Sequence, residues 1–392
     1  MADTTPQTPG LLPQFYEVDS ASVPGEMGTI INLEAIAAPS NAEAWRVIYR
    51  SQTAAGVTVP VSGIIVAPSN VEVGENLPIL SWAHGTVGVA RYCAPSNVPN
   101  PATDFVGYPS FESDVPNDYG IPGLSRFLDA GYVVAATDYQ GLGAGQQHEY
   151  IIALTQARNA LDIIRAARAV VPNAGDKAAV LGWSQGGLTA LIAGEIADYT
   201  PEVDLVGVAS MAPANPASFL IPEISRQSIG GPVIGRSILL ARSYSWAYED
   251  LKLTDMLSDV GIKAAKASER QCIQQLSTTG ETAGGSHALM RLSNPNVDAW
   301  VDRFIENAPG QRVSLAPVLV MQGTADATIP PASTDLYMIA ACQFSAPILR
   351  INYEGKDHRP LVTAAEDDFF TWIHGRFSGA KAQSSCPQHD PG

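Results

Sequence analysis

A serine lies between two glycines in the segment Gly182-Trp183-Ser184-Gln185-Gly186, the only Gly-x-Ser-x-Gly of the chain. A short apolar run at residues 178–181 precedes it, and a helical pattern follows it. This context is typical of a nucleophile elbow, in which a sharp turn strains the backbone of the serine and leaves room only for glycine on either side. The alternative, a chance match in a chain with 34 glycines, does not explain the flanking strand and helix. We therefore expect Ser184 to be a nucleophile, with Gly182 and Gly186 forming the turn.

The six histidines differ in their positions relative to the predicted strands. A serine hydroxyl is a poor nucleophile near neutral pH, so an imidazole must take its proton. His84 follows a predicted strand but precedes Ser184, whereas His358 lies in the loop just after the last predicted strand, residues 348–353. The other four lie before a helix, in the helical segments or in the tail. We expect His358 to be the base; the alternative is a surface histidine of that loop.

An acid must hold this imidazole in the tautomer that accepts the proton. Asp326 directly follows the predicted strand at residues 317–321, which gives the chain order serine, acid, histidine. Glu354 and Asp357 are alternatives, but a neighbour on the same short loop is badly placed to reach the far ring nitrogen. Asp138 follows an earlier strand, and we expect it to bond loop backbone. The acid is therefore predicted to be Asp326.

Attack on a carbonyl group develops negative charge on its oxygen, which fixed N–H groups must stabilise. One donor is the residue after the serine, so we expect the backbone of Gln185 to supply it. The segment Trp82-Ala83-His84-Gly85-Thr86 follows another predicted strand, and its glycine lets the backbone approach the site. Thr86 is the candidate for the second donor, and an ordinary turn glycine is the alternative interpretation of this segment.

Short apolar runs bounded by turn residues recur along the chain and predict buried parallel strands. They lie at residues 78–83, 132–136, 178–181, 205–211, 317–321 and 348–353. Helical patterns between them, clearest at residues 154–167, indicate an α/β fold with a mostly parallel, doubly wound sheet. Residues 46–51 and 57–66 predict an antiparallel pair at its edge.

Residues 215–308 break this alternation and show no convincing strand. Their helical patterns lie at residues 233–247, 253–267 and 297–307. An insertion of this length in an enzyme is more often a cap over the site than a structureless loop. The expected division is a catalytic domain of residues 41–214 and 309–392, a helical cap of residues 215–308, and an N-terminal arm of residues 1–40. The apolar residues of the cap suit an acyl tunnel, although packing among its own helices explains most of them.

Composition excludes several classes of protein. The 392 residues are 46% hydrophobic and 16% charged, which is typical of a folded chain. The net charge is −16 and there is no dense basic run, so nucleic acid is not an expected partner. No apolar stretch reaches the roughly 18 to 20 residues that cross a bilayer. The first ten residues lack the basic and apolar segments of a signal peptide, so none is expected in this chain.

The chain has four cysteines, Cys93, Cys272, Cys342 and Cys386. None forms a Cys-x-x-Cys pair, so neither a zinc site nor a thioredoxin-like site is expected. Their number permits two disulfides in three pairings, or four free thiols. The residues by themselves leave both possibilities open, and with them the cellular compartment.

Together these motifs resemble those of the secretory lipases of the lipase A type, within the α/β-hydrolase superfamily. The resemblance spans most of the chain and rests on Tyr49-Arg50-Ser51, Val61-Ser62-Gly63, Trp82 through Thr86, Asp138-Tyr139-Gln140-Gly141-Leu142-Gly143, Gly182 through Gly187, Gly323 through Asp326, and His358. It implies that Ser184, Asp326 and His358 form a triad, with Thr86 and Gln185 at the oxyanion hole. It further implies a helical lid across residues 215–305 and no metal or organic cofactor.

The same resemblance implies two disulfides, Cys93 with Cys272 and Cys342 with Cys386. The first would tie the loop after the oxyanion strand to the lid, and the second would tie the helix before the last strand to the C-terminal tail. Disulfides form in oxidising compartments. The expectation is therefore an exported protein, secreted or periplasmic.

The leading hypothesis is hydrolysis of carboxylic esters, lipid-like or small and hydrophobic, through a covalent acyl-enzyme. A serine peptidase is an alternative, because Gly-Trp-Ser-x-Gly-Gly also resembles the elbow of prolyl-oligopeptidase-type enzymes. The 183 residues before Ser184 are too few for the large β-propeller of those peptidases. Acyl transfer by the same acyl-enzyme is a further alternative, while a non-catalytic binding module predicts a broken triad. Acyl chain length, alcohol and oligomeric state stay open.

Overall fold

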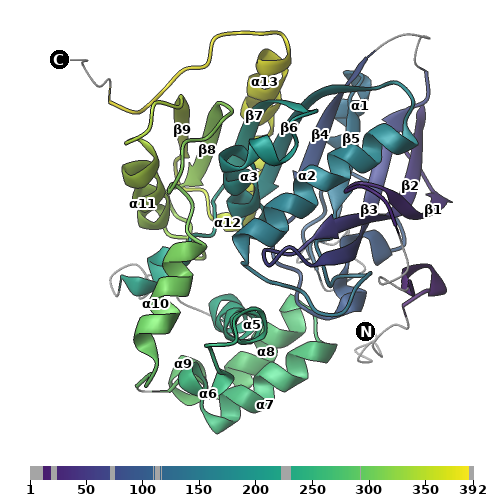
Figure 1. Ribbon diagram of the computed structural model, residues 1–392. Helices are drawn as coiled ribbons and strands as arrows, with labels where there is room; N and C mark the ends of the chain where they lie inside the picture. Colours follow the sequence, from purple (N-terminus) through teal and green to yellow (C-terminus); the bar gives the residue numbers. More distant parts are fainter. Residues whose placement is uncertain are drawn as a thin grey trace.

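A nine-stranded mixed sheet forms the centre of the computed structural model, which describes residues 12–18, 24–70, 76–108, 110, 115, 117–221, 231–291 and 293–387 (Figure 1). The strand order is β1-β2-β3-β5-β4-β6-β7-β8-β9. The strands are Ile30–Ile36 (β1), Ala42–Gln52 (β2), Thr58–Pro68 (β3), Leu77–Ala83 (β4), Val133–Thr137 (β5), Ala174–Trp183 (β6), Asp204–Met211 (β7), Val318–Gly323 (β8) and Ile348–Tyr353 (β9). Pairing is antiparallel from β1 to β5 and parallel from β5 to β9. The predicted mostly parallel α/β sheet with an antiparallel edge is confirmed.

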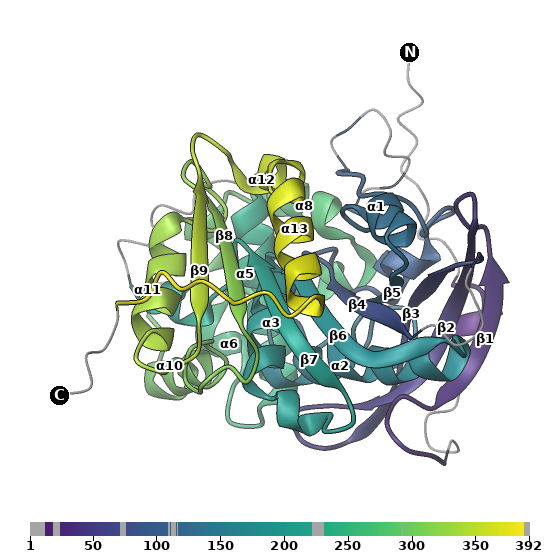
Figure 2. The same ribbon diagram turned by 90° about the horizontal axis from the view of Figure 1, so that it is seen from above.

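The central strands are buried on both faces, which explains their continuous apolar sequences. Every residue of β5 and of β8 is buried. Helices α2 (Ala153–Val170) and α3 (Gln185–Glu195) cover one face of the sheet, and α1 (Leu124–Asp129) and α13 (Glu366–Phe377) cover the other (Figure 2). The apolar core is accordingly split into two large clusters, one on each side.

One strand lies within the segment that the sequence predicts to be an arm. Residues 30–36 form β1, which pairs antiparallel with β2 at the edge of the sheet. Its residues are half-buried or exposed, and none is fully buried. An edge strand is held mainly by backbone hydrogen bonds to one neighbour, so its side chains need no apolar pattern. This is why the sequence does not reveal it.

The insertion between β7 and β8 contributes no strand to the sheet among its described residues. Its helices are α5 (Gly231–Ala247), α6 (Leu253–Met256), α7 (Asp259–Ala267), α8 (Ile273–Thr282), α9 (Ser286–Leu289) and α10 (Val297–Glu306). Helices α5 to α9 gather below the sheet in Figure 1. The single helix predicted at residues 253–267 is broken, because Ser258 accepts a hydrogen bond from the N–H of Gly261 and so begins α7 as its N-cap. Residues 222–230 of the expected cap lie outside the described residues.

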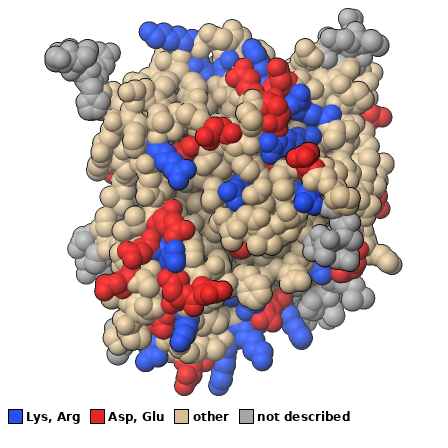
Figure 3. Space-filling model, viewed as in Figure 1, with Lys and Arg blue, Asp and Glu red and all other residues tan. Residues whose placement is uncertain are grey.

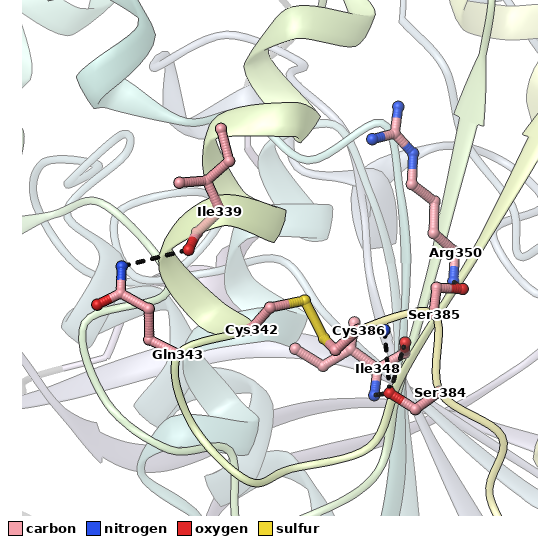
Figure 4. Close-up of a disulfide and its surroundings, with 8 residues drawn as sticks. All are labelled: Ile339, Cys342, Gln343, Ile348, Arg350, Ser384, Ser385 and Cys386. Atoms are coloured by element: carbon pink, nitrogen blue, oxygen red, sulfur yellow. Dashed lines mark hydrogen bonds between the residues drawn. A yellow bond between two sulfur atoms is a disulfide. The ribbon is translucent and has the colours of Figure 1, made fainter. Parts of the chain in front are cut away.

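Two disulfides join distant parts of the chain. Cys93 is bonded to Cys272, which precedes α8 of the insertion. Cys342, at the end of α11 (Pro331–Ala341), is bonded to Cys386 in the C-terminal tail (Figure 4). Both pairs are those that the resemblance implies.

The second disulfide closes the C-terminal tail against the edge of the sheet. The tail runs beside β9, where the N–H of Ser385 donates to the carbonyl oxygen of Ile348 at 2.7 Å, and Ser385 Oγ accepts from the N–H of Arg350 at 3.0 Å. Figure 4 shows these residues next to the Cys342–Cys386 bond. The tail therefore covers part of the free edge of β9.

No helix in the described ranges has the length and apolar character needed to cross a membrane.

Candidate active site

Ser184 sits at the turn between β6 and α3 in a strained backbone conformation, with φ 58° and ψ −114°. Positive φ is uncommon for a residue with a side chain and marks a position that its surroundings force. A Cβ on Gly182 would lie 1.9 Å from the carbonyl oxygen of Gly186, and one on Gly186 would lie 1.8 Å from that of Ala83. Glycine is therefore required at both positions, because the chain crosses itself there without space for a methyl group.

The structure brings Ser184, His358 and Asp326 into one hydrogen-bonded chain. Ser184 Oγ lies 2.9 Å from His358 Nε2, and His358 Nδ1 lies 2.7 Å from Asp326 Oδ2. The three side chains are almost completely buried, at 2%, 3% and 3% exposure respectively. They follow the carboxyl ends of β6, β8 and β9, which lie at the same edge of the sheet, with β7 between β6 and β8. In this geometry Asp326 fixes the tautomer with a proton on Nδ1, which leaves Nε2 free to accept the proton of Ser184.

Asp326 is itself held in place through its second oxygen. Oδ1 accepts hydrogen bonds from the N–H groups of Thr328 at 2.9 Å and Ile329 at 2.8 Å. The Trp183 ring packs against the imidazole of His358, with 4.9 Å between centroids, and its Nε1 donates to the His358 carbonyl oxygen. Asp326 and His358 are therefore oriented by neighbours that do not take part in the chain of hydrogen bonds.

The three other acids that the sequence raised occupy different places. Asp357 is the N-cap of α12 (His358–Ala364), where its carboxylate accepts from the N–H groups of His358 and Ala327. Asp138 is buried and bonds the backbone N–H and the hydroxyl of Ser96, as well as the hydroxyl of Ser62. Glu354 is exposed. None of the three is hydrogen-bonded to the imidazole of His358.

Thr86 and Gln185 both lie beside the candidate site and are buried. Gln185 is the first residue of α3, so its N–H has no acceptor within the helix. The backbone hydrogen bonds of the described residues also include none from the N–H of Thr86. The Thr86 hydroxyl is 2.9 Å from the hydroxyl of Tyr150. Two amides without a backbone acceptor are what an oxyanion hole needs.

A buried histidine that the sequence did not single out supports Gln185. The Gln185 Nε2 lies 3.0 Å from His148 Nε2, and His148 Nδ1 lies 2.8 Å from the carbonyl oxygen of Gln140. Since the carbonyl can only accept, Nδ1 carries the proton and Nε2 accepts from the Gln185 amide. Burial lowers the pKa of His148 to about 3, so the ring is neutral and this polarity is fixed. Nothing in the sequence around His148 marks it, because only the fold brings its ring to the side chain of Gln185, 37 residues further along the chain.

A small cavity of about 40 Å³ opens beside Ser184. Its walls come from both the sheet and the insertion, and its lining includes Tyr150, Phe219, Arg236, Leu240, Ile329 and Ser333. Arg236 belongs to α5, and Ser333 belongs to the first turn of α11. The insertion therefore covers part of the space next to the serine. No pattern in the sequence marks Arg236 or Ser333, because only the fold brings them to this cavity.

Within the described ranges, no group of three or more His, Cys, Asp or Glu side chains is arranged to hold a metal ion. On the face shown in Figure 3, lysine and arginine side chains are interspersed with aspartate and glutamate and form no broad basic surface. This distribution agrees with the net charge of −16.

Residues 118–385 match the family model described as secretory lipase. Among solved structures, the closed state of lipase A from Candida antarctica has a TM-score of 0.74 and 20% identity, over 94% of this chain and 86% of that chain. The rice cell wall degrading esterase LipA from Xanthomonas oryzae has a TM-score of 0.69 and 16% identity, over 90% of this chain and 98% of that chain. No curated protein matches the chain. At these identities the two structures show a shared fold.

Proposed function

Because the chain belongs to the secretory lipase family and is a serine ester hydrolase, we propose that Ser184, His358 and Asp326 carry its reaction as nucleophile, base and orienting acid. The observation that supports this most directly is the continuous hydrogen-bonded path from Ser184 Oγ through both ring nitrogens of His358 to Asp326. It joins residues 174 and 32 positions apart in the sequence; all three are buried, and Ser184 lines the cavity.

The proposed reaction proceeds in two halves. In the first, Ser184 Oγ forms a bond to the ester carbonyl carbon while its proton passes to His358 Nε2. The N–H groups of Gln185 and Thr86 donate to the resulting oxyanion. The bond from carbon to the alcohol oxygen then breaks, and Nε2 returns the proton to the leaving alcohol. An acyl group remains on Ser184.

In the second half, water attacks the acyl carbon while His358 takes its proton. The bond to Ser184 Oγ breaks, and the proton on Nε2 returns to that oxygen. Asp326 stays ionised throughout and stabilises the imidazolium that forms twice in the cycle. Gln185 is kept in place by its side-chain bond to neutral His148.

The walls of the cavity favour hydrophobic esters. Ile151, Leu240 and Ile329 supply apolar surface next to Ser184. Lipid-like or small hydrophobic esters are therefore the proposed substrates. The family match favours ester hydrolysis over the peptidase alternative. With the two disulfides, the family also supports an extracellular location.

The test combines covalent labelling with a substrate series. A fluorophosphonate probe is expected to label Ser184 alone, and Ser184→Ala is expected to lower kcat on 4-nitrophenyl butyrate by about 10⁴-fold or more. Ser218→Ala is the matched control, because Ser218 lines the same cavity but its hydroxyl donates to the carbonyl oxygen of Asn215. An S184A protein that keeps the activity of the wild type would overturn the assignment. Rates on 4-nitrophenyl esters from acetate to palmitate then measure the chain-length preference.

A further inference from the structure

Arg236 is a buried arginine that has no counter-ion among the described residues. It belongs to α5, its exposure is 9%, and it lines the cavity that contains Ser184. Its Nε and Nη1 are inaccessible and make no hydrogen bond to any described residue. Ion pairs of the described residues involve other arginines, among them Arg242 on the same helix, which pairs with Glu269 at 2.9 Å.

The charged and titratable groups around Arg236 do not compensate its charge. Asp118 is already engaged by Arg359, whose Nε and Nη2 reach its two carboxylate oxygens at 3.0 and 3.2 Å. Tyr108 lies beneath the Arg359 guanidinium, 4.0 Å from its carbon to the ring centroid. Burial raises the pKa of Tyr150, so this phenol is neutral. Arg359 is a second cation, and its charge together with burial lowers the pKa of Arg236.

An unpaired guanidinium at this depth is costly. Buried charges in proteins are almost always paired, because the desolvation of an ion is repaid only by an opposite charge with good hydrogen bonds. Arginine keeps its proton even when buried, so it cannot escape the cost by neutralisation as lysine does. The described residues offer no free anion to this guanidinium, and the cavity next to Ser184, where we propose that the substrate binds, lets the anion of a bound molecule reach it.

A second unsatisfied group faces the same cavity. Ser333 is 1% exposed, and its hydroxyl makes no hydrogen bond among the described residues. It lies in α11 on the sheet side, whereas Arg236 lies in the insertion. Two buried donors from different parts of the fold thus line a cavity that otherwise carries apolar side chains such as Leu240 and Ile329.

We propose that the preferred substrate is an ester that carries a carboxylate, which pairs with Arg236 while the scissile carbonyl lies at Ser184. The planar guanidinium matches a carboxylate in a two-point hydrogen bond. The Ser333 hydroxyl is a further donor to the polar part of the substrate. This inference rests on the proposed ester hydrolysis and names its substrate class.

The test compares pairs of esters that differ in one charged group. Monomethyl adipate and methyl hexanoate have the same chain up to the terminal group and place the charge on the acyl side. The acetate ester of 4-(hydroxymethyl)benzoic acid and benzyl acetate place it on the alcohol side. At pH 7 the carboxylates are ionised. The wild type is expected to prefer the charged member of at least one pair by about tenfold or more in kcat/KM, since a hydrogen bond to a charged group carries that much discrimination.

Variants locate the source of this preference. Arg236→Met is expected to lower the ratio of the two kcat/KM values by about 10- to 100-fold, and Arg236→Lys, which keeps the charge but loses the planar fork, is expected to lower it less. Arg242→Met is the matched control on the same helix and should leave the ratio unchanged. Free glutarate should inhibit the wild type in competition with the charged ester, and less so R236M. Circular dichroism verifies that each variant is folded.

Two results would overturn the inference. One is a wild-type enzyme that prefers the neutral ester in both pairs, a measurement that needs no variant. The other is an R236M protein with the same ratio as the wild type. If either of these two results is obtained but methyl hexanoate and benzyl acetate are still hydrolysed in a Ser184-dependent way, the proposed function stands and only the carboxylate preference fails. If no ester is hydrolysed through Ser184, the proposed function itself fails.

Discussion

Replacing Asp326 with asparagine tests the role of the buried acid without changing the shape of the site. Oδ1 of Asp326 accepts from two backbone N–H groups, those of Thr328 and Ile329, while Oδ2 faces the proton on His358 Nδ1. An asparagine satisfies the two backbone donors only with its carbonyl oxygen, so its NH₂ group is turned toward His358. Nδ1 must then accept, and the proton of the neutral ring moves to Nε2.

This tautomer cannot take the proton of Ser184, because Nε2 already carries one. Only the rare tautomer with the proton on Nδ1 can then react. In that tautomer the Nδ1–H group faces the N–H group of the asparagine amide at a separation of about 2.7 Å, which is unfavourable. A tautomer reversal of this kind costs about 10⁴-fold in kcat, or about 5.5 kcal/mol of transition-state stabilisation. The Michaelis constant should change little, since the substitution touches no surface of the cavity.

Steady-state kinetics on 4-nitrophenyl butyrate measure both constants, and thermal unfolding verifies the fold. The control is Asp357→Asn, which changes the neighbouring carboxylate that caps α12 and accepts from backbone N–H groups instead of from the imidazole. Asparagine is also a good N-cap, so D357N should keep kcat within about threefold and lose less than about 1 kcal/mol of stability. A D326N enzyme with more than a tenth of the wild-type kcat would refute the reasoning, because it would show that the tautomer is not set by this carboxylate.

Two further predictions concern stability. Replacing Cys93 and Cys272 by serine opens a loop of 179 residues in the unfolded chain, and urea titrations should show a fall of up to about 5 kcal/mol in the unfolding free energy. Replacing Cys342 and Cys386 opens a loop of 44 residues, and the fall should be up to about 4 kcal/mol. Equal stability of the wild type and C93S/C272S would contradict this prediction. Burial raises the pKa of Glu195 from 4.5 to about 7, so the native state favours its proton and loses stability as pH rises from 4.5 through 7. The unfolding free energy of Glu195→Gln should therefore exceed that of the wild type by at most about 3 kcal/mol at pH 8 and should equal it at pH 4. An equal gain in unfolding free energy at both pH values would show that the ionisation of this carboxyl is not its cause.

Local signals explain which parts of the fold and the site the sequence could predict. The elbow around Ser184 is encoded in five consecutive residues, and the glycines are there because any Cβ would overlap the backbone. Asp326 and His358 were predicted from a topological rule, since the ends of parallel strands meet at one edge of the sheet. The continuous apolar runs marked the central strands because those strands are buried on both faces.

Features that depend on long-range packing left no such signal. β1 is an exposed edge strand, so its side chains carry no pattern of burial. The disulfide pairing came only from the resemblance to a family, because spacing alone permits three pairings. Arg236 looks like an ordinary helical arginine in the sequence. Only the fold shows that its guanidinium is buried without a counter-ion among the described residues. The sequence cannot reveal this, because it depends on every residue that packs around the guanidinium.

The first disulfide also limits how the insertion can move relative to the oxyanion loop. Next to the Cys93–Cys272 bond, Gly88 and Cys272 form an isolated β-bridge, and the N–H of Ile273 donates to the carbonyl oxygen of Val87 at 2.8 Å. Thr86, the proposed oxyanion donor, is the neighbour of Val87 in the same loop. The start of α8 is therefore fixed to the loop that carries this proposed donor. A motion of the insertion that admits a larger substrate must pivot about this end, since separating α8 from the loop would require breaking a covalent bond.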